Sequence, residues 1–223
     1  MSHELRTPLN AVIGFSEILK RGLFGPLGDE RYSGYAVDIG RSGQHLLSLI
    51  NDILDLSKVE AGKQELQERA LDVADVMRGS AEVVEGQAAE AGVELALTLD
   101  GELPRLRADA RLVRQMLLNL LSNAIKFTPE GGRVEAAATI LGGRMTLTVR
   151  DNGIGIAAED LDKALTPFGQ VENPLARKYH GTGLGLPLVK ELVELHDGSL
   201  DITSQPGTGT AVTLNFPAER MIN

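Results

Sequence analysis

The first sixty residues carry apolar side chains at helical spacing. Leu5, Leu9, Val12, Ser16 and Leu19 follow one another at intervals of four, three, four and three residues. This is the heptad spacing of a seam between packed helices. The pattern predicts an amphipathic helix whose seam contains one polar residue.

A second seam follows a segment rich in glycine. Residues 22–29, GLFGPLGD, contain three Gly and one Pro and are expected to form a loop. Leu46, Ile50, Ile53 and Ser57 then repeat the seam spacing. Two such helices cannot bury their apolar stripes alone, so we expect two hairpins to pair into a four-helix bundle, which makes the protein a homodimer. Packing of the hairpin onto the rest of the chain is the alternative.

From Gln64 the pattern changes to short strands that alternate with helices. Strands are expected at 66–70, 93–99, 133–141, 144–150, 200–204 and 210–216, and helices at 73–91, 110–127 and 184–196. Helices between the strands of a mixed sheet predict an α/β two-layer sandwich. The chain is therefore expected to be multi-domain, with an all-α helical hairpin at 1–60, a linker, and an α/β domain at 64–218.

Composition excludes several classes of protein. The net charge of -9 and the 4% aromatic content, with no Trp, argue against binding of nucleic acid. The absence of Cys excludes disulfides and thiolate zinc sites and suits a reducing cytoplasm. No apolar run approaches the ~20 residues that span a bilayer, so we expect no membrane contact by this chain, although an anchor can precede it.

Two amides and an ammonium group share one side of the helix expected at 110–127. Asn119 and Asn123 are four residues apart, and Lys126 follows three residues later. Such a set can hold a magnesium ion and phosphate oxygens. The alternative is an ordinary solvated helix face.

The segment DNGIGI follows directly after an expected strand. Asp151 at the end of that strand can accept a hydrogen bond from an exocyclic amine such as that of adenine. Gly153 and Gly155 allow a ring to approach the backbone closely. An ordinary Asp-Asn-Gly turn is the alternative.

A glycine-rich segment opens the helix expected at 184–196. In GTGLGL, residues 181–186, exposed backbone N–H groups and the helix dipole create an anion site. The polar loop 167–180 before it is expected to close over a nucleotide as a lid. PGTGT, residues 206–210, places Thr210 beside a base or simply forms a hairpin turn.

In this order the motifs resemble the ATP-binding fold shared by histidine kinases, the Hsp90 chaperone and the MutL repair protein. In addition, HELRTPLN, residues 3–10, resembles the phosphoacceptor box of histidine kinases at every characteristic position. The chain from His3 to Pro217 therefore resembles the catalytic core of a bacterial sensor histidine kinase.

The residue types in the acceptor box suit phosphoryl transfer to a histidine. His3 precedes Leu5 by two residues, about 200° around a helix, so it is expected to point away from the seam. Glu4 can accept the imidazole N–H proton and polarise the ring. Thr7, one turn further on, can position a water for the reverse hydrolysis, and Pro8 is expected to bend the helix.

The resemblance implies a role for each motif residue. Asn123 is expected to ligate Mg²⁺, Asn119 and Lys126 to contact phosphates, and Asp151 to bind adenine in a pocket lined by Gly153 and Gly155. The other residues expected to bind ATP are Phe127, Ile156, Phe168, Arg177, Gly181, Thr182, Gly183, Leu184, Gly185 and Thr210.

The expected activity is ATP-dependent autophosphorylation of His3, followed by phosphoryl transfer to an aspartate of a response-regulator receiver domain. An ATPase of the Hsp90 or MutL type is an alternative, but those proteins carry a water-activating Glu at the position of Asn119. A phosphatase-dominated protein or a pseudokinase scaffold is another alternative, since Thr7 leaves phosphatase activity open.

Two features depart from the family pattern. Gln170 stands where many relatives carry a phosphate-binding Arg, a role that can pass to Arg177 or Lys178. The acceptor box begins at residue 3, whereas relatives extend the first helix before it, so we expect the chain to be a piece of a longer protein. His45 and His196 are expected to be structural, and no transition-metal site is expected.

Overall fold

The computed structural model describes residues 2–23, 25–170 and 182–222. The chain divides into two compact units, Met1–Lys58 and Val59–Asn223. Each unit is described by itself. Within the described residues, no helix is both long enough and apolar enough to span a bilayer.

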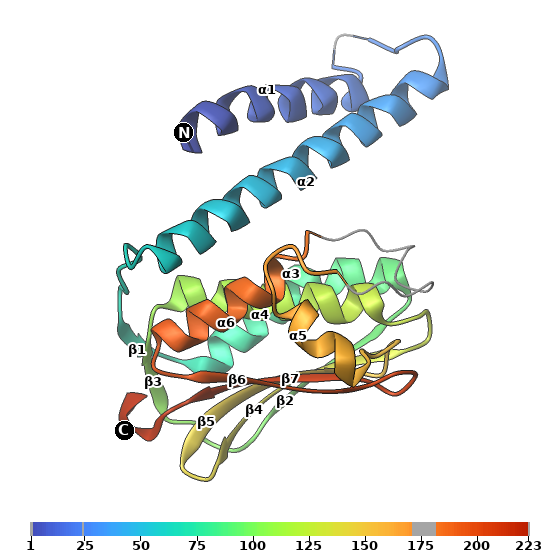
Figure 1. Ribbon diagram of the computed structural model, residues 1–223. Helices are drawn as coiled ribbons and strands as arrows, with labels where there is room; N and C mark the ends of the chain where they lie inside the picture. Colours follow the sequence, from blue (N-terminus) through green and yellow to red (C-terminus); the bar gives the residue numbers. More distant parts are fainter. Residues whose placement is uncertain (1, 24, 171–181, 223) are drawn as a thin grey trace. The chain divides into compact units, whose positions relative to one another are not determined.

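The first unit is the expected helical hairpin (Figure 1). Its helices are α1 (Ser2–Arg21) and α2 (Glu30–Glu60). The helices touch where Gly43 of α2 lies against the side chain of Ile13. Ser16, the polar member of the first seam, is buried and donates its hydroxyl proton to the Ile13 carbonyl at 2.7 Å. The polar seam position therefore satisfies its own hydrogen bond within α1.

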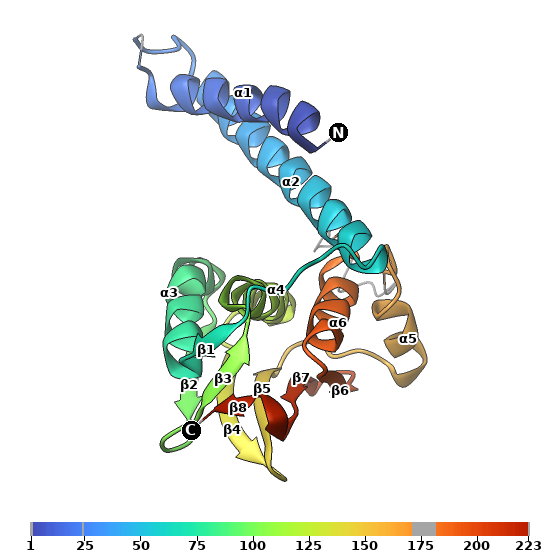
Figure 2. The same ribbon diagram turned by 90° about the vertical axis from the view of Figure 1, so that its left-hand side faces the viewer.

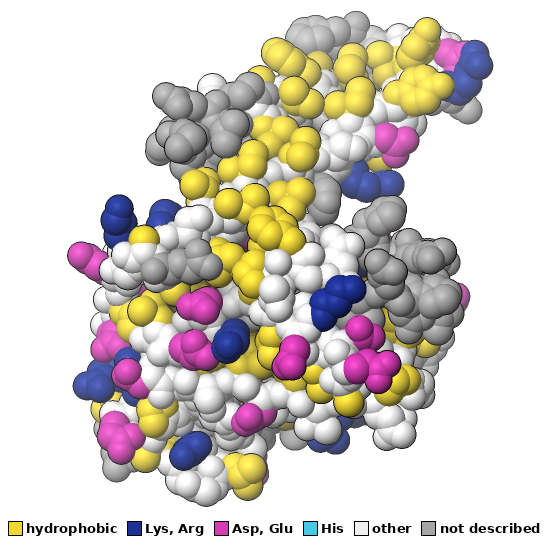
Figure 3. Space-filling model, viewed as in Figure 1, with side chains coloured by type: hydrophobic (Ala, Val, Ile, Leu, Met, Phe, Trp, Pro, Cys, Tyr) yellow, Lys and Arg dark blue, Asp and Glu magenta, His cyan; other side chains and the backbone are white. Residues whose placement is uncertain are grey.

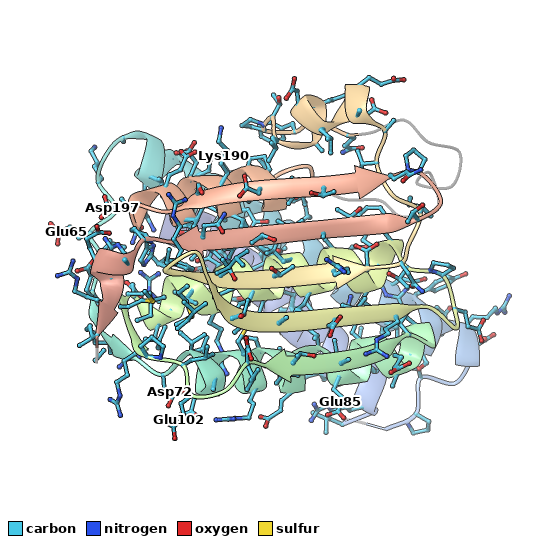
Figure 4. The ribbon with its side chains drawn as sticks, turned by 90° about the horizontal axis from the view of Figure 1, so that it is seen from below. Glu65, Asp72, Glu85, Glu102, Lys190 and Asp197 are labelled. Carbon is cyan, nitrogen blue, oxygen red and sulfur yellow. The ribbon has the colours of Figure 1, made fainter. Side chains whose placement is uncertain are left out.

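The second unit contains a five-stranded sheet in the order β2-β4-β5-β7-β6. The pair β2–β4 is parallel and the other pairs are antiparallel, so the prediction of a mixed sheet is confirmed. The strands are β2 (Glu94–Leu99), β4 (Arg133–Leu141), β5 (Arg144–Asp151), β6 (Ser199–Gln205) and β7 (Gly209–Phe216). Figure 4 shows this sheet from the face opposite its helices.

Three helices cover one face of this sheet (Figures 1 and 2). They are α3 (Val73–Ala91), α4 (Ala110–Phe127) and α6 (Gly185–Leu195). The core lies between the two layers, because most of the largest buried side chains come from α4, α6 and the alternate positions of β5 and β7. Short helical turns η1 (Ala158–Asp160) and α5 (Leu161–Ala164) follow β5. The prediction of a two-layer α/β sandwich is confirmed.

Residues next to the helix ends satisfy the terminal backbone groups of α3 and α4. Asp109 caps α4, and its Oδ1 accepts the backbone N–H of Arg111 at 3.0 Å. Gly92 closes α3 in the left-handed conformation, with φ 66°. A side-chain acceptor at a helix start and a glycine at a helix end satisfy backbone groups that lack partners within the helix.

A second, three-stranded sheet was not predicted. Its order is β1-β3-β8, with β1 (Arg69–Leu71), β3 (Arg105–Ala108) and β8 (Met221–Ile222). The short helical turn η3 (Ala218–Arg220) directly precedes β8. The strand that was expected at 66–70 is found at 69–71, and the strands β3 and β8 were not predicted. Strands of two to four residues carry too little alternation to be recognised, and their pairing partners are distant in sequence.

Candidate nucleotide site

The asparagine side of α4 is partly buried and has an unsatisfied donor. Asn119 and Asn123 are half-buried, and the buried Nδ2 of Asn119 lacks a hydrogen-bond partner among the described residues. Burial also lowers the pKa of Lys126, whose ammonium lies 5.0 Å from the centre of the Phe127 ring. A buried amide donor without a partner is costly unless a ligand meets it.

The start of α6 lies against these asparagines. A Cβ placed on Gly185, the first residue of α6, would lie 3.4 Å from Asn123 Nδ2 and 4.0 Å from Asn119 Cγ. The hydroxyl of Thr182 accepts the backbone N–H of Leu184 at 3.1 Å, and Leu184 is fully buried. The positive end of the α6 dipole therefore faces the same space as the amides of α4, which suits an anion.

The turn after β5 is hydrogen-bonded to the end of α4. The backbone N–H of Ile154 donates to the Phe127 carbonyl at 3.1 Å. Gly155 has φ +67°, and a Cβ there would collide with the backbone carbonyl of Gln205. This position therefore requires glycine on both conformational and steric grounds.

Asp151 begins this turn, and one of its carboxylate oxygens accepts hydrogen bonds from the backbone. Its Oδ1 accepts the N–H of Gly153 at 2.9 Å and the N–H of Thr210 at 3.2 Å. Burial raises the pKa of Asp151, while these two hydrogen bonds oppose that shift. Oδ2 takes no part in these two bonds, so it can accept from a donor on a ligand.

Phe168, near the start of the expected lid, is hydrogen-bonded to Gly183, which follows the lid. The backbone N–H of Phe168 donates to the Gly183 carbonyl at 2.9 Å. Gly183 has φ +69°, and a Cβ there would lie 2.7 Å from the carbonyl carbon of Phe168. Phe168 itself has φ +62°, an uncommon conformation for a residue with a side chain. The expected site residues Phe168 and Gly183 are therefore neighbours.

Sequence reasoning missed one polar residue beside the Asp151 turn. The hydroxyl of Ser204, on β6, accepts the N–H of Ile156 at 2.8 Å and lies 2.8 Å from the hydroxyl of Thr210. A hairpin turn was one of the two interpretations of residues 206–210, and the strands on either side of it pair Ser204 with Thr210. This strand pairing was the signal in the sequence that could have identified Ser204. A single serine within a strand belongs to no recognised motif.

Several expected site residues belong to the hairpin or lie outside the described residues. The side chains of His3 and Glu4 lie outside the described residues, although their backbone belongs to α1. Thr7 is exposed on α1. Arg177 and Gly181, together with Lys178, lie outside the described residues, and the Gln170 side chain is exposed.

The histidine at the end of α6 has a structural environment. His196 is fully buried, its Nδ1 donates to the Leu192 carbonyl at 2.7 Å, and its Nε2 accepts the N–H of Asp109 at 3.2 Å. Burial lowers the pKa of this imidazole. The expectation that His196 is structural agrees with this environment.

The donor set suits a phosphate-bearing ligand with its counter-ion. The two amides of α4 and the start of α6 meet in one region. Lys126 follows on α4, and the turn that carries Asp151 is hydrogen-bonded to the end of α4. Among the residues that the structure describes, no group of three His, Asp or Glu side chains is arranged around a metal ion. An ion held here would therefore use an amide oxygen and oxygens of the ligand, as Mg²⁺ does.

Two family models match the chain. Residues 108–220 match "Histidine kinase-, DNA gyrase B-, and HSP90-like ATPase", and residues 1–62 match "His Kinase A (phospho-acceptor) domain". The chain therefore belongs to the family of histidine kinase-, DNA gyrase B- and HSP90-like ATPases. Its phospho-acceptor hairpin then makes it the catalytic core of a sensor histidine kinase.

Individual relatives agree with this assignment. The chain is 52% identical over 221 residues to the "Non-motile and phage-resistance protein" of Caulobacter vibrioides, covering 97% of this chain and 26% of that relative. It is 42% identical over 231 residues to the cell-division control histidine kinase PdhS of Brucella suis, covering 100% of this chain and 22% of the relative. The chain thus spans about a quarter of the length of these relatives.

A solved structure shares the fold over nearly the whole chain. Full-length ShkA in complex with AMPPNP aligns with a TM-score of 0.81 and 34% identity, covering 97% of this chain and 44% of that one. The AdeS histidine kinase of Acinetobacter baumannii aligns with a TM-score of 0.68 and 25% identity, covering 99% of this chain and 98% of that one.

Proposed function

We propose that this chain binds ATP with Mg²⁺ and transfers the γ-phosphoryl group to His3, from which it passes to an aspartate of a response-regulator receiver domain. The observation that carries this proposal is the meeting of Asn119 and Asn123 with the first residue of α6, where the Asn119 amide lacks a partner among the described residues. The ATP analogue in the ShkA complex supports the choice of nucleotide.

The phosphate end of ATP lies, in this proposal, between α4 and α6. Asn119 and Lys126 contact phosphate oxygens, and the backbone N–H groups at the start of α6 receive further oxygens. Asn123 holds Mg²⁺, which when bound neutralises charge on the phosphates. Burial lowers the pKa of Lys126, and a phosphate oxygen beside the ammonium would raise it again.

The adenine end lies at Asp151. Its Oδ2 accepts the exocyclic amine, while the two backbone hydrogen bonds to Oδ1 hold the carboxylate in place. Gly153 and Gly155 leave room for the ring, and Thr210 borders it. Phe127, Ile156, Thr182, Leu184 and Gly183 complete the pocket, with Phe168 at the base of the lid and Arg177 and Gly181 in the lid.

His3 is the phosphoryl acceptor. The imidazole nitrogen attacks the γ-phosphorus in line, the new N–P bond replaces the O–P bond to ADP, and Glu4 accepts the proton that the imidazole releases. Positioning and charge neutralisation supply most of the rate in such a transfer. Residues 1–60 then serve as the phosphoacceptor hairpin and residues 64–218 as the ATP-binding domain.

The hairpin is proposed to dimerise through its exposed apolar side chains. Figure 3 shows hydrophobic side chains gathered along the visible face of both helices. Val12, Leu19, Leu46 and Ile53 of the two seams are 40–51% exposed, and Phe15 is 66% exposed. Helices with so much exposed apolar surface gain stability when a second copy covers it.

The transfer to His3 can be tested with labelled nucleotide. Incubation of the chain with γ-labelled ATP and MgCl₂ is expected to give a phosphoprotein that is labile to acid and stable to alkali, because N–P bonds to imidazole have this character. His3→Gln should abolish the label. His45→Gln, a change on the same hairpin, should retain it. Label that persists in His3→Gln, or none in the wild type, would overturn the proposal.

A further inference from the structure

A junction of polar residues joins four segments of the second unit that are distant in sequence. The first segment lies just before β1, the second between β3 and α4, the third after α6, and the fourth in η3. The proposed function gives these residues no role. We call this set the polar junction, and its members are Gln67, Glu68, Asp109, His196, Asp197 and Arg220.

Asp109 uses its backbone N–H and both carboxylate oxygens within this junction. Oδ1 accepts the N–H of Arg111 and so caps α4, while Oδ2 accepts the backbone N–H of Gln67 at 3.1 Å. The N–H of Asp109 donates to Nε2 of His196 at 3.2 Å. Asp109 is buried, so these bonds are shielded from water. One residue thus joins the segment before β1 to the start of α4 and the end of α6.

Arg220 holds the same segments together a second time. Its Nη1 donates to Glu68 Oε1 and to the Arg107 carbonyl, and its Nη2 donates to Asp197 Oδ2 at 2.8 Å. The Arg220 side chain is only 6% exposed. The segment before β1, the end of β3 and the turn after α6 are therefore fixed to one another by two separate sets of hydrogen bonds.

The polar junction and the nucleotide site lie at opposite ends of the same two helices. Asn119 follows Asp109 by ten residues, which is about 15 Å along α4 at the rise of an α-helix. Gly185 precedes His196 by eleven residues, about 16 Å along α6. An effect of the junction on a bound nucleotide must therefore be carried by these helices.

The connection from the hairpin ends at this junction. α2 ends at Glu60, and only residues 61–66 separate it from Gln67. A displacement of this short connection acts first on the hydrogen bond between Gln67 and Asp109. Because the same carboxylate caps α4, a displacement that breaks this bond also releases one of the contacts that orient the cap.

We propose that Asp109 is a positioning residue that couples the connection from the hairpin to the nucleotide site. The bond from Gln67 orients the carboxylate that caps α4, and α4 in turn places Asn119 and Asn123 against the start of α6. This inference rests on the proposed function, in which these groups hold the phosphates. Coupling of this kind is reciprocal, so bound nucleotide stabilises the Gln67 bond by the factor by which that bond strengthens nucleotide binding.

A proline at position 67 tests the coupling, because it removes the N–H donor and leaves Asp109 and its contact with Arg111 in place. The affinity of the whole chain for ADP is measured by titration calorimetry in MgCl₂. In Gln67→Pro it is expected to fall about fivefold, the lower end of the range for coupled sites. Glu65→Pro stiffens the same segment two residues earlier and should leave the affinity unchanged.

A second variant changes the acceptor of the same hydrogen bond. Asp109→Asn keeps one oxygen for the cap of α4 and loses the other, so it should weaken ADP binding as Gln67→Pro does. Asp72 caps α3 through the N–H of Asp75 at 3.1 Å, so Asp72→Asn makes the same change at a cap outside the junction. Asp72→Asn should leave the affinity unchanged.

Hydrogen exchange gives a readout that a merely structural role would not change. Saturating ADP is expected to slow the exchange of the Gln67 and Asp109 amides about fivefold in the wild type, by reciprocity. The Asp75 amide, at the cap of α3, should exchange at an unchanged rate. NMR resolves these single amides. Equal slowing at Asp75 would show only a general stabilisation by ligand and would overturn the inference.

The outcomes separate this inference from the proposed function. Unchanged ADP affinity in Gln67→Pro, or exchange at Gln67 and Asp109 that does not respond to ADP, would overturn the inference, while ADP binding by the wild type would leave the proposed function intact. If the wild type does not bind ADP, both fail. Should Gln67→Pro not fold, Asp109→Asn decides, and an unchanged affinity there would also overturn the inference.

Discussion

At the scale of single residues, one buried amide marks the candidate site. The buried Nδ2 of Asn119 has no hydrogen-bond partner in the described part of the chain. Such a group costs about 1–3 kcal/mol of folding free energy. In the proposed function a phosphate oxygen meets this donor, so we attribute the cost to nucleotide binding.

Replacing this amide by an apolar side chain should separate the two effects. In Asn119→Leu the unsatisfied donor is removed, so the free energy of unfolding without nucleotide is expected to rise by about 1 kcal/mol. The affinity for ADP should fall about tenfold or more, because a phosphate contact is lost. Denaturant unfolding and calorimetric titration measure the two quantities.

Asn215 provides the matched control for this substitution. Its Nδ2 donates to Asp201 Oδ2 at 2.6 Å, so this amide is satisfied. Asn215→Leu should therefore lose stability, if it changes at all, and leave ADP affinity unaltered. A loss of stability in Asn119→Leu together with unchanged ADP affinity would contradict the assignment of Asn119 to the site.

At the scale of elements, one buried hydrogen bond joins the start of α4 to the end of α6. Asp109 caps α4, its backbone N–H donates to Nε2 of His196, and its Oδ2 accepts the N–H of Gln67 at 3.1 Å. Arg220, from η3, lies nearby and pairs with Glu68 at 2.5 Å. The helices that carry the asparagines and the glycine-rich start are thus fixed to each other at their opposite ends.

This junction predicts a dependence of stability on pH. Burial lowers the pKa of His196 below its ordinary value of about 6.5. As pH falls through about 6.5 the unfolded chain binds a proton that the folded state does not bind. The free energy of unfolding of residues 59–223 should therefore decrease as pH falls, by up to about 1.4 kcal/mol per pH unit from this group.

A variant without an ionisable group isolates the contribution of His196. In His196→Gln this contribution to the pH dependence between pH 7.5 and 5 should disappear, whereas wild type and variant share every other titrating group. Chemical denaturation at several pH values gives the difference. Parallel curves for the two proteins would show that His196 does not titrate as proposed.

At the scale of the whole molecule, the two units obtain their stability from different sources. The unit of residues 59–223 buries a continuous core between its sheet and helices. The hairpin buries few side chains of its own, among them Ala36 and Leu56, and leaves most of its seams exposed. Its stability in isolation should be low and should increase when two copies associate.

Thermal unfolding is therefore expected to show two transitions. The hairpin transition should move to higher temperature with protein concentration, by mass action, and the other transition should not. Phe15→Asp places a charge on the exposed apolar face of α1 and should lower only the hairpin transition. Val83→Asp, at an equally exposed position of α3, should leave both in place. Calorimetry at two concentrations measures these shifts, and concentration-independent transitions would argue against a dimer.

The sequence alone was sufficient for the long elements and for the class of site. The seam spacing, the cap at Asp109 and the helix end at Gly92 are local signals, because each depends on residues within a few positions of one another. The motif residues Asn123, Asp151 and Gly185 could likewise be named from their order along the chain. Local spacing encodes local geometry, and a resemblance carried by several motifs adds to it.

Only the tertiary structure decided which distant groups meet. The three-stranded sheet, the contact between Gly185 and Asn123, and the place of Ser204 beside Thr210 all depend on pairings between separated segments. The unsatisfied donor of Asn119 likewise appears only when its surroundings are known. Burial and hydrogen-bond satisfaction are properties of the packed environment, so no window of sequence contains them.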